Sequence, residues 1–347
     1  MADCERLLVY ARQRRSRYRE GSNEDEAIVN AAELLCQLLT QDVERLKDGR
    51  TRIKPGVAKN RIVSVTDSEM RHGRKSKSQR FDGHKASVAV DCDSALITSV
   101  GVLAGNDPDA KNSLERVEQT EALTGCEVEK TIGDCALGGS ETRRAFAEAG
   151  RLLVAKVPKA PTNGYLPKEK FTIDLENNTV TCPAGHQCST WHEVLVRSGS
   201  SGKKCRVKRF TFDGETCQAC WLHDQCVASS QGRGRSITLN PEEALLQQAR
   251  EYQRTEAFIE DLKGRQVAKH RIARLIQLGM RKSRFFGRHK TAFQVYMAAA
   301  VANLTLIAAW ESRNAAPAAA DFFVFFLLGG LALIFTPRIS RVTAKIF

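Results

Sequence analysis

The order of extended and helical patterns between residues 61 and 157 restricts the fold of this 347-residue chain more than any other feature. Short apolar runs, several of them alternating with polar residues, are typical of strands, and two longer helical patterns lie between them. The expected strands are 61–67, 86–91, 97–103, 127–133 and 152–157, and the expected helices are 109–123 and 140–149. Three strands followed by alternating helices and strands predict an α/β chain with a mixed sheet and helices packed on it.

Two aspartates stand at the ends of expected strands: Asp67 closes the first, and Asp134 follows the fourth. If these strands are neighbours, the two carboxylates converge at one sheet edge and repel each other unless a cation lies between them. Hard oxygen ligands suit Mg²⁺ or Mn²⁺, and such ions promote phosphoryl transfer. A turn or a helix cap is the alternative role, and the usual one, for an aspartate at a strand end.

A basic loop follows Asp67 and predicts contacts with phosphate groups. It carries no acid between Glu69 and Arg80, which leaves its positive charge unbalanced. The cations expected to bind nucleic acid here are Arg71, Arg74, Lys75, Lys77, Arg80 and Lys85. A solvated run of charge is the alternative.

Residues 262–290 form a second basic segment, with ten Lys or Arg and no Asp or Glu. Apolar residues at helical spacing and the interleaved Phe285 and Phe286 predict an amphipathic helix that contacts a phosphate backbone. The expected contacts are Arg265, Arg271, Arg274, Arg281, Lys282, Arg284, Arg288 and Lys290. Such a helix also suits a membrane or a protein surface, but the net charge of +13 favours a polyanion.

Six of the 11 cysteines lie between residues 182 and 226. Cys217 and Cys220 form a C-x-x-C pair, which presents two thiolates to one ion. With Cys182 and Cys226 they can complete a tetrahedral Zn²⁺ site, although a redox pair or buried free thiols explain the same residues. Further candidate ligands are Cys188, Cys205, His186 and His223.

Composition divides the chain into five segments. The first residues lack an apolar core of export-signal length, which favours a cytoplasmic protein with reduced thiols. Residues 322–335 are apolar but shorter than the ~20 residues that span a bilayer, so we expect a buried tail rather than a membrane anchor. The expected segments are a helical 1–58, a first core part 59–157, a Cys-rich insertion 158–235, a helical second core part 236–312 and an apolar tail 313–347.

Several of these segments together resemble the DDE transposases of bacterial insertion sequences. The stretch from Thr66-Asp67 to Lys85 resembles their first acidic motif, and Thr131-Ile-Gly-Asp134 resembles the second. The cysteines from 217 to 226 resemble an insertion that some of these enzymes carry. Residues 265–303, including Arg271-Ile-Ala-Arg-Leu275, resemble the third-motif helix and the segment after it.

The resemblance implies a ribonuclease-H-like mixed sheet with flanking helices, interrupted by the small Cys-rich insertion. It implies three acids that hold Mg²⁺ or Mn²⁺, hydrolysis of the phosphodiester at a transposon end, and attack of the freed 3′ hydroxyl on target DNA. The implied partners are transposon-end and target DNA and further copies of the chain, with no small-molecule cofactor. The implied location is the cytoplasm, at the nucleoid.

One position departs from the family pattern. Members carry a Glu four residues after an Arg on the third-motif helix, whereas Lys269 stands four residues after Arg265. The nearest upstream acids, Glu260 and Asp261, lie ~12–13 Å away along a helix. We therefore expect a transposase that has lost its third ligand, unless one of these acids replaces it. A non-catalytic DNA-binding protein, using the zinc module and the basic helix, is the alternative.

Overall fold

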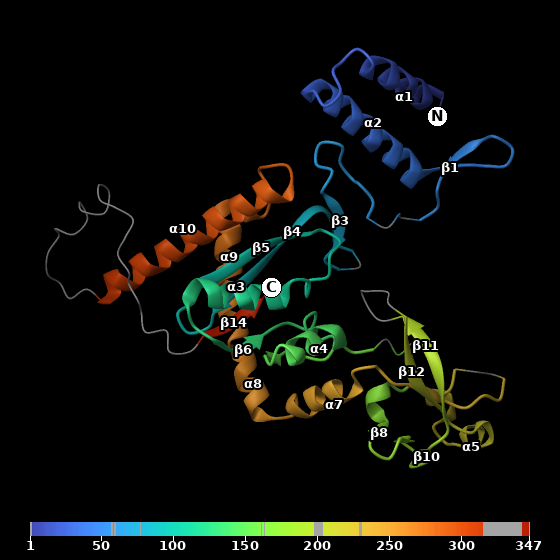
Figure 1. The fold of residues 1–347 in the computed structure, drawn as a ribbon. Coiled ribbons are helices and arrows are strands. Elements are labelled where there is room, and N and C mark those ends of the chain that lie inside the picture. The colour runs from blue at the N-terminus through green and yellow to red at the C-terminus, as the bar shows by residue number, and fades with distance from the viewer. Residues whose placement is uncertain are drawn as a thin grey trace. The chain divides into compact units, whose positions relative to one another are not determined.

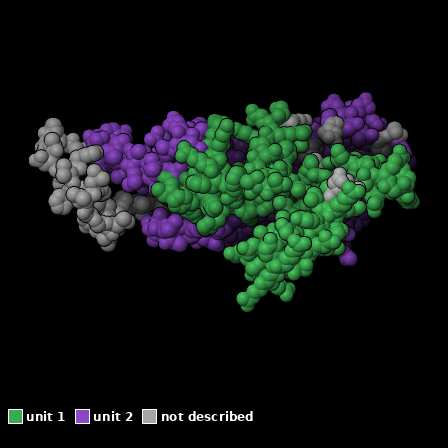
Figure 2. Space-filling view, turned by 90° about the horizontal axis from the view of Figure 1, so that it is seen from above, with its two compact units in different colours: residues 1–86, 102–107, 280–297 green, residues 87–101, 108–279, 298–347 purple. Residues whose placement is uncertain are grey.

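The computed structural model divides the chain into two compact units, which Figure 2 colours separately. Unit 1 comprises residues 1–86, 102–107 and 280–297, and unit 2 comprises residues 87–101, 108–279 and 298–347. The residues described are 2–56, 58, 60–76, 78–160, 162, 164–197, 204–228, 231–314 and 342–346. The apolar tail expected at 322–335 and the expected contact Lys77 lie outside them.

Unit 1 begins with two helices and a short hairpin. α1 (Ala2–Arg15) and α2 (Asn23–Asp42) precede β1 (Val43–Arg45) and β2 (Thr51–Ile53), which pair antiparallel. The Ser22 hydroxyl accepts a hydrogen bond from the backbone N–H of Asp25. The buried Asp25 carboxylate accepts a hydrogen bond from Arg15 Nε at 2.7 Å. Because a serine cap satisfies a free N–H group at a helix start, α2 begins at Asn23.

A second hairpin in unit 1 carries the first basic segment. β3 (Arg71–Arg74) pairs antiparallel with the first residues of β4 (Arg80–Asp91). The backbone packs closely here, since a Cβ on Gly73 would lie 2.5 Å from the carbonyl oxygen of Gly105. Residues 71–74 and Arg80, which the sequence suggests are part of a loop, therefore belong to the two strands of a hairpin.

The strand expected at residues 61–67 is not formed, and that prediction is wrong. Only an isolated bridge joins Ile62 to Arg71. The Asp67 carboxylate accepts the backbone N–H groups of Glu69 and Met70, both at 3.1 Å. Such local bonds between a side chain and the backbone favour a turn over a strand.

The main sheet has mixed order, so the expected α/β class is confirmed. β5 (Ile97–Ala104) pairs with β4, and β6 (Val128–Ile132) runs parallel to β7 (Leu152–Val154). β14 (Val342–Ile346) lies between β4 and β6, antiparallel to the first and parallel to the second. The strand that joins the two halves of the sheet thus comes from residues 342–346 (Figure 1).

Two helices pack on this sheet in unit 2. α3 (Ser113–Thr124) contacts β6 and β14, and α4 (Ser140–Glu148) contacts β7. Both expected helices are confirmed, although the first begins at Ser113 rather than at residue 109. The buried side chains of their shared core are Ala89, Val117, Val128, Leu137, Phe146, Leu153 and Ala155.

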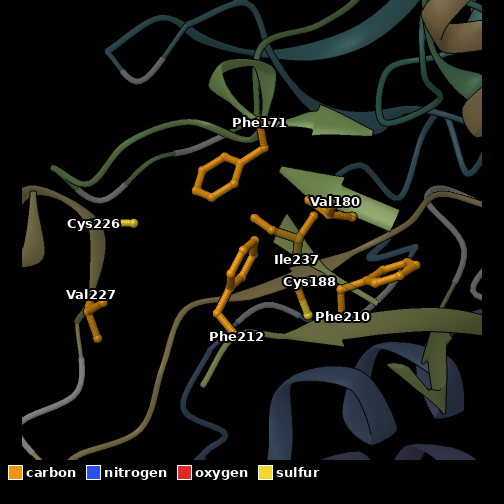
Figure 3. Close-up of a cluster of buried hydrophobic side chains, with 8 residues drawn as sticks. All are labelled: Phe171, Val180, Cys188, Phe210, Phe212, Cys226, Val227 and Ile237. Atoms are coloured by element: carbon orange, nitrogen blue, oxygen red, sulfur yellow. The ribbon is translucent and has the colours of Figure 1, made fainter. Parts of the chain in front are cut away.

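The cysteine-rich part of unit 2 folds around a separate apolar core, shown in Figure 3. The strands β8 (Thr172–Asp174), β9 (Thr179–Thr181) and β10 (Gln187–Cys188) form one antiparallel sheet after the short helix η1 (Lys168–Lys170). A second antiparallel sheet consists of β11 (Trp191–Arg197), β12 (Lys204–Thr211) and β13 (Ser236–Thr238). The short helices α5 (Gly214–Gln218) and α6 (His223–Cys226) follow β12. The core side chains are Phe171, Val180, Cys188, Phe210, Phe212, Cys226, Val227 and Ile237.

The remaining described elements are helical. α7 (Glu243–Tyr252), α8 (Glu256–Lys263) and α9 (Arg265–Leu275) precede the π-helical turn η2 (Ile276–Met280), where Gly279 adopts φ 92°. Because positive φ strains other residues, this glycine ends the helical run. α10 (Arg288–Asn314) comes next; among the described helices it is the one long and apolar enough to cross a membrane by length and composition.

Candidate active site and nucleic-acid interface

Asp67 is buried in unit 1 and its carboxylate is fully hydrogen-bonded. Oδ1 accepts hydrogen bonds from the backbone N–H groups of Glu69 and Met70. Oδ2 accepts one from His84 Nε2 at 3.1 Å and one from the Gly287 N–H at 2.9 Å. Burial opposes ionisation, but the Gly287 N–H and His84 outweigh it and hold the pKa of Asp67 below its usual value. Both oxygens are therefore engaged by the protein itself.

Glu69 makes a second contact with the same segment. Its carboxylate accepts the Arg288 N–H at 2.7 Å and Arg288 Nε at 2.9 Å, and these donors lower the pKa of Glu69. Arg288 is the first residue of α10, so the two acids lie at a helix N-terminus, where the helix dipole favours negative charge. Sequence reasoning missed this role of Glu69, His84 and Gly287, because the partners lie far apart in the chain.

Asp134 belongs to unit 2 and is more open. It follows β6, is partly exposed, and its Oδ1 accepts the Ala136 N–H at 2.8 Å. The buried Leu137 anchors this turn. Asp67 lies in unit 1 and Asp134 in unit 2. In the described part of the chain, no three His, Cys, Asp or Glu side chains stand close enough to hold a metal ion as they are.

The third position of the expected acidic set lies on α9, where Lys269 is exposed beside the buried Ala268. α9 contains no Asp or Glu. The two possible substitutes lie on α8 and are occupied. Glu260 binds Lys263 Nζ at 2.5 Å, and Asp261 accepts the Tyr252 hydroxyl at 2.5 Å and Lys130 Nζ at 3.0 Å.

Arg271 requires a correction, since it was expected to contact DNA. It is buried, its burial lowers the pKa of the guanidinium, and it donates to Asn303 Oδ1 at 3.5 Å. Asn303 in turn bonds both backbone groups of Ile97, accepting its N–H and donating to its carbonyl oxygen, each at 2.9 Å. Arg271 therefore supports the packing of α10 on β5 inside unit 2.

Most of the other expected cations in unit 1 lie on its surface. Arg71 and Lys85 are half-buried and donate to backbone carbonyls of Ser68 and Asp107, respectively. In unit 2, Arg265 and Arg274 are half-buried on α9. Among the expected DNA contacts in unit 1, the exposed cations are Arg74, Lys75, Arg80, Arg281, Lys282, Arg284, Arg288 and Lys290.

The basic loop 281–287 is held in place by Gln294 of α10. The buried Gln294 side chain accepts the Arg284 N–H at 2.9 Å and donates to the Lys282 carbonyl oxygen at 3.1 Å. A cavity of about 410 Å³ lies between this loop and the β3–β4 hairpin. His84, Lys85, Arg281 and Lys282 line it. Two basic segments that are distant in sequence thus meet around one hollow of unit 1.

The four cysteines expected to bind zinc line one small pocket in unit 2, here called the cysteine pocket: Cys182, Cys217, Cys220 and Cys226. All four are free thiols. Burial raises the pKa of Cys226, and the three neighbouring thiols add to that rise while Arg235 opposes it. The expected alternatives Cys188 and Cys205 lie elsewhere, with their thiols donating to backbone carbonyls. His186 and His223 also line the pocket.

Comparison with known families concerns the second half of the chain. The sequence of residues 181–308 matches the model of a family described as a transposase DDE domain. Residues 181–308 are therefore similar to a transposase DDE domain. The matched residues include the cysteine pocket, Lys269 and most of α10, but neither Asp67 nor Asp134.

The match supports a DDE transposase of the insertion-sequence type and therefore a function in DNA transposition. Searches of curated proteins and of solved structures gave no match.

Proposed function

We propose that this chain is a DDE transposase that binds DNA and has lost cleavage because Lys269 replaces its third acid. The family that this sequence resembles catalyses metal-dependent hydrolysis at transposon ends, followed by strand transfer. The observation that carries the proposal is the exposed Lys269. It lies among the residues that match the transposase family, on a helix that contains no Asp or Glu. A lysine ammonium repels the Mg²⁺ or Mn²⁺ that this position would hold.

Asp67 and Asp134 are the residues that would hold the divalent ion, but Asp67 does not fit that task as it stands. Its two oxygens accept four protein donors, so a cation would have to displace the Gly287 N–H or His84. Asp261, one of the two possible substitutes for the third acid, is bound by Tyr252 and Lys130. In both acids, protein donors therefore occupy the oxygens that would bind a cation.

DNA binding rests on unit 1. Lys85 of β4 and the exposed Arg281 and Lys282 of the loop before α10 line one hollow of unit 1. Further exposed cations lie on the β3–β4 hairpin. Lysine and arginine side chains on a solvated surface bind the phosphate backbone with little dependence on sequence. DNA, as transposon ends and as target, is the proposed substrate of this surface. The proposed location is the nucleoid in the cytoplasm, and the proposed assembly contains further copies of the chain.

The proposed fold of the core is ribonuclease-H-like, interrupted by the cysteine-rich part. Its support is the mixed sheet of unit 2, in which a central strand has one antiparallel and one parallel neighbour. The helices α3 and α4 pack on the same sheet.

The experiment combines binding and cleavage on one substrate. Supercoiled plasmid carrying the coding sequence with its flanking DNA is incubated with the purified chain and Mn²⁺, and nicked circles are quantified. Binding to fragments of the same DNA is measured over a salt series. We expect binding that weakens as salt rises and no nicking above that of Asp134→Ala. Mn²⁺-dependent nicking that Asp134→Ala abolishes would overturn the loss of cleavage, and the absence of binding at low salt would overturn the DNA-binding function.

A further inference from the structure

The cysteine pocket draws its four thiols from three short segments of unit 2. Cys182 follows β9, Cys217 lies on α5 with Cys220 just after it, and Cys226 ends α6. They line a space of about 20 Å³, which is large enough for a single small occupant. A C-x-x-C pair and two further thiols around one small space are the ligand set that tetrahedral Zn²⁺ prefers.

Two tight turns present these thiols to the same space. In the first, the Gly185 N–H donates to the Cys182 carbonyl oxygen and the Cys182 N–H donates to that of His186, both at 2.9 Å. Gly185 adopts φ 89°, a left-handed conformation that other side chains rarely adopt. In the second, the Cys220 N–H donates to the Cys217 carbonyl oxygen at 3.3 Å. These turns therefore hold the backbone of Cys182, Cys217 and Cys220 in place around the pocket.

Arg235 contacts one thiol of the cysteine pocket and the backbone around it. Its backbone N–H donates to Cys217 Sγ at 3.5 Å, and its guanidinium donates to the carbonyl oxygens of Cys226 and Leu166, both at 2.8 Å. Groups of this kind, placed just outside the ligands, orient and tune metal sites.

The remaining cysteines of this region serve as an internal comparison. Cys188 Sγ donates to the Thr211 carbonyl oxygen at 3.3 Å, and Cys205 Sγ donates to that of Val196 at 3.7 Å. Neither lines the cysteine pocket. Their thiols are already satisfied by the backbone, whereas the four other cysteines line one pocket.

We propose that Cys182, Cys217, Cys220 and Cys226 bind one structural Zn²⁺ ion. On zinc binding, the four thiol groups move toward the ion until each sulfur reaches the ~2.3 Å of a zinc–sulfur bond. Binding displaces the thiol protons and joins three segments around a core of eight buried side chains. The ion stabilises the fold of the cysteine-rich part and has no role in cleavage, so this proposal does not depend on the proposed function.

The test begins with the zinc content of the full chain, purified under reducing conditions and dialysed against a weak chelator. We expect one zinc ion per chain, and replacement by Co²⁺ that gives the absorption bands of a tetrahedral thiolate site. Cys217→Ser should abolish stoichiometric binding, whereas Cys205→Ser should retain it. Zinc far below one ion per chain in the reduced wild-type protein, or equal loss in both variants, would overturn the proposal.

A second measurement covers the case in which Cys217→Ser fails to fold. Thiol modification of the native wild-type protein is timed with and without a strong chelator. We expect chelation to release zinc together with four additional fast-reacting thiols. Release of zinc without any change in thiol reactivity would overturn the proposal. So would a disulfide between Cys217 and Cys220 that forms in zinc-free protein despite the presence of a reductant. DNA binding and nicking enter neither measurement, so failure here leaves the proposed function untouched.

Discussion

Oδ2 of Asp67 accepts the backbone N–H of Gly287 at 2.9 Å, across a separation of 220 residues in the chain. The same oxygen accepts His84 Nε2 from β4. These bonds join the turn before the β3–β4 hairpin to the loop before α10, inside unit 1. The first aspartate of the expected acidic set is thus a structural link between the two basic segments.

Removing this link should destabilise unit 1. Asp67→Ala leaves the Gly287 N–H and His84 without an acceptor, and we expect the free energy of unfolding to fall by ~1–3 kcal/mol. Asp82→Ala is the matched control, since this exposed aspartate also binds a histidine, His72. Its effect should stay within ~0.5 kcal/mol. Urea unfolding measures both, and equal effects of the two variants would contradict the role of Asp67.

The lowered pKa of Asp67 predicts a dependence of stability on acid. Because the folded pKa lies below the unfolded value of 3.8, the contribution of Asp67 is complete above that value. It is lost as the pH falls through the lower folded pKa. Urea unfolding between pH 6 and pH 3 should therefore show a steeper loss for the wild type than for Asp67→Asn. Parallel curves for the two proteins would show that the Asp67 carboxylate is not stabilised by folding.

The basic loop before α10 should account for part of the salt dependence of DNA binding. Arg281→Ala combined with Lys282→Ala removes two exposed charges, and each lost phosphate contact reduces the slope of log K against log salt by about 0.9. Arg50→Ala, in the turn between β1 and β2, is the control, because Arg50 already pairs with Asp48. The double variant should lower the slope by about 2, and an unchanged slope would exclude these residues from the DNA contact.

Asn303 should matter for stability rather than for DNA. Asn303→Ala removes the bonds to both backbone groups of Ile97 and the acceptor of the buried Arg271. We expect a loss of ~1–3 kcal/mol in the free energy of unfolding, with the salt slope unchanged. Ser312→Ala, on an exposed turn of α10, should have little effect on either quantity. A change in DNA affinity without loss of stability would place Asn303 at the interface instead.

Elements with a strong local pattern could be predicted from the sequence. The helices α3 and α4 and the strands β6 and β7 follow the periodicity of their own residues. The C-x-x-C pair together with Cys182 and Cys226 predicted four thiols at one site, and these four line one pocket. The strand expected at 61–67 failed because Asp67 binds the backbone of the next residues and makes a turn. Local alternation carries no information about such competing bonds.

Contacts between distant segments could not be predicted in this way. Nothing in the residues around Asp67 indicates that the N–H of Gly287 completes its hydrogen bonding, and charge alone placed Arg271 on the surface. Burial of an arginine depends on what packs over it, here α10 with Asn303. Likewise, β14 joins a sheet whose other strands lie two hundred or so residues earlier, which no local pattern encodes.

The most direct test of the account is the Mn²⁺-dependent nicking of plasmid DNA by the wild type and by Lys269→Glu. Lys263→Glu, on α8, serves as the control for adding an acid to an exposed lysine position. The account predicts that the wild type and Lys263→Glu bind DNA without nicking it, and that Lys269→Glu gains nicking which Asp134→Ala removes. Nicking by the wild type, or no gain in a folded, DNA-binding Lys269→Glu protein, would contradict the assignment of Lys269 as the lost third acid.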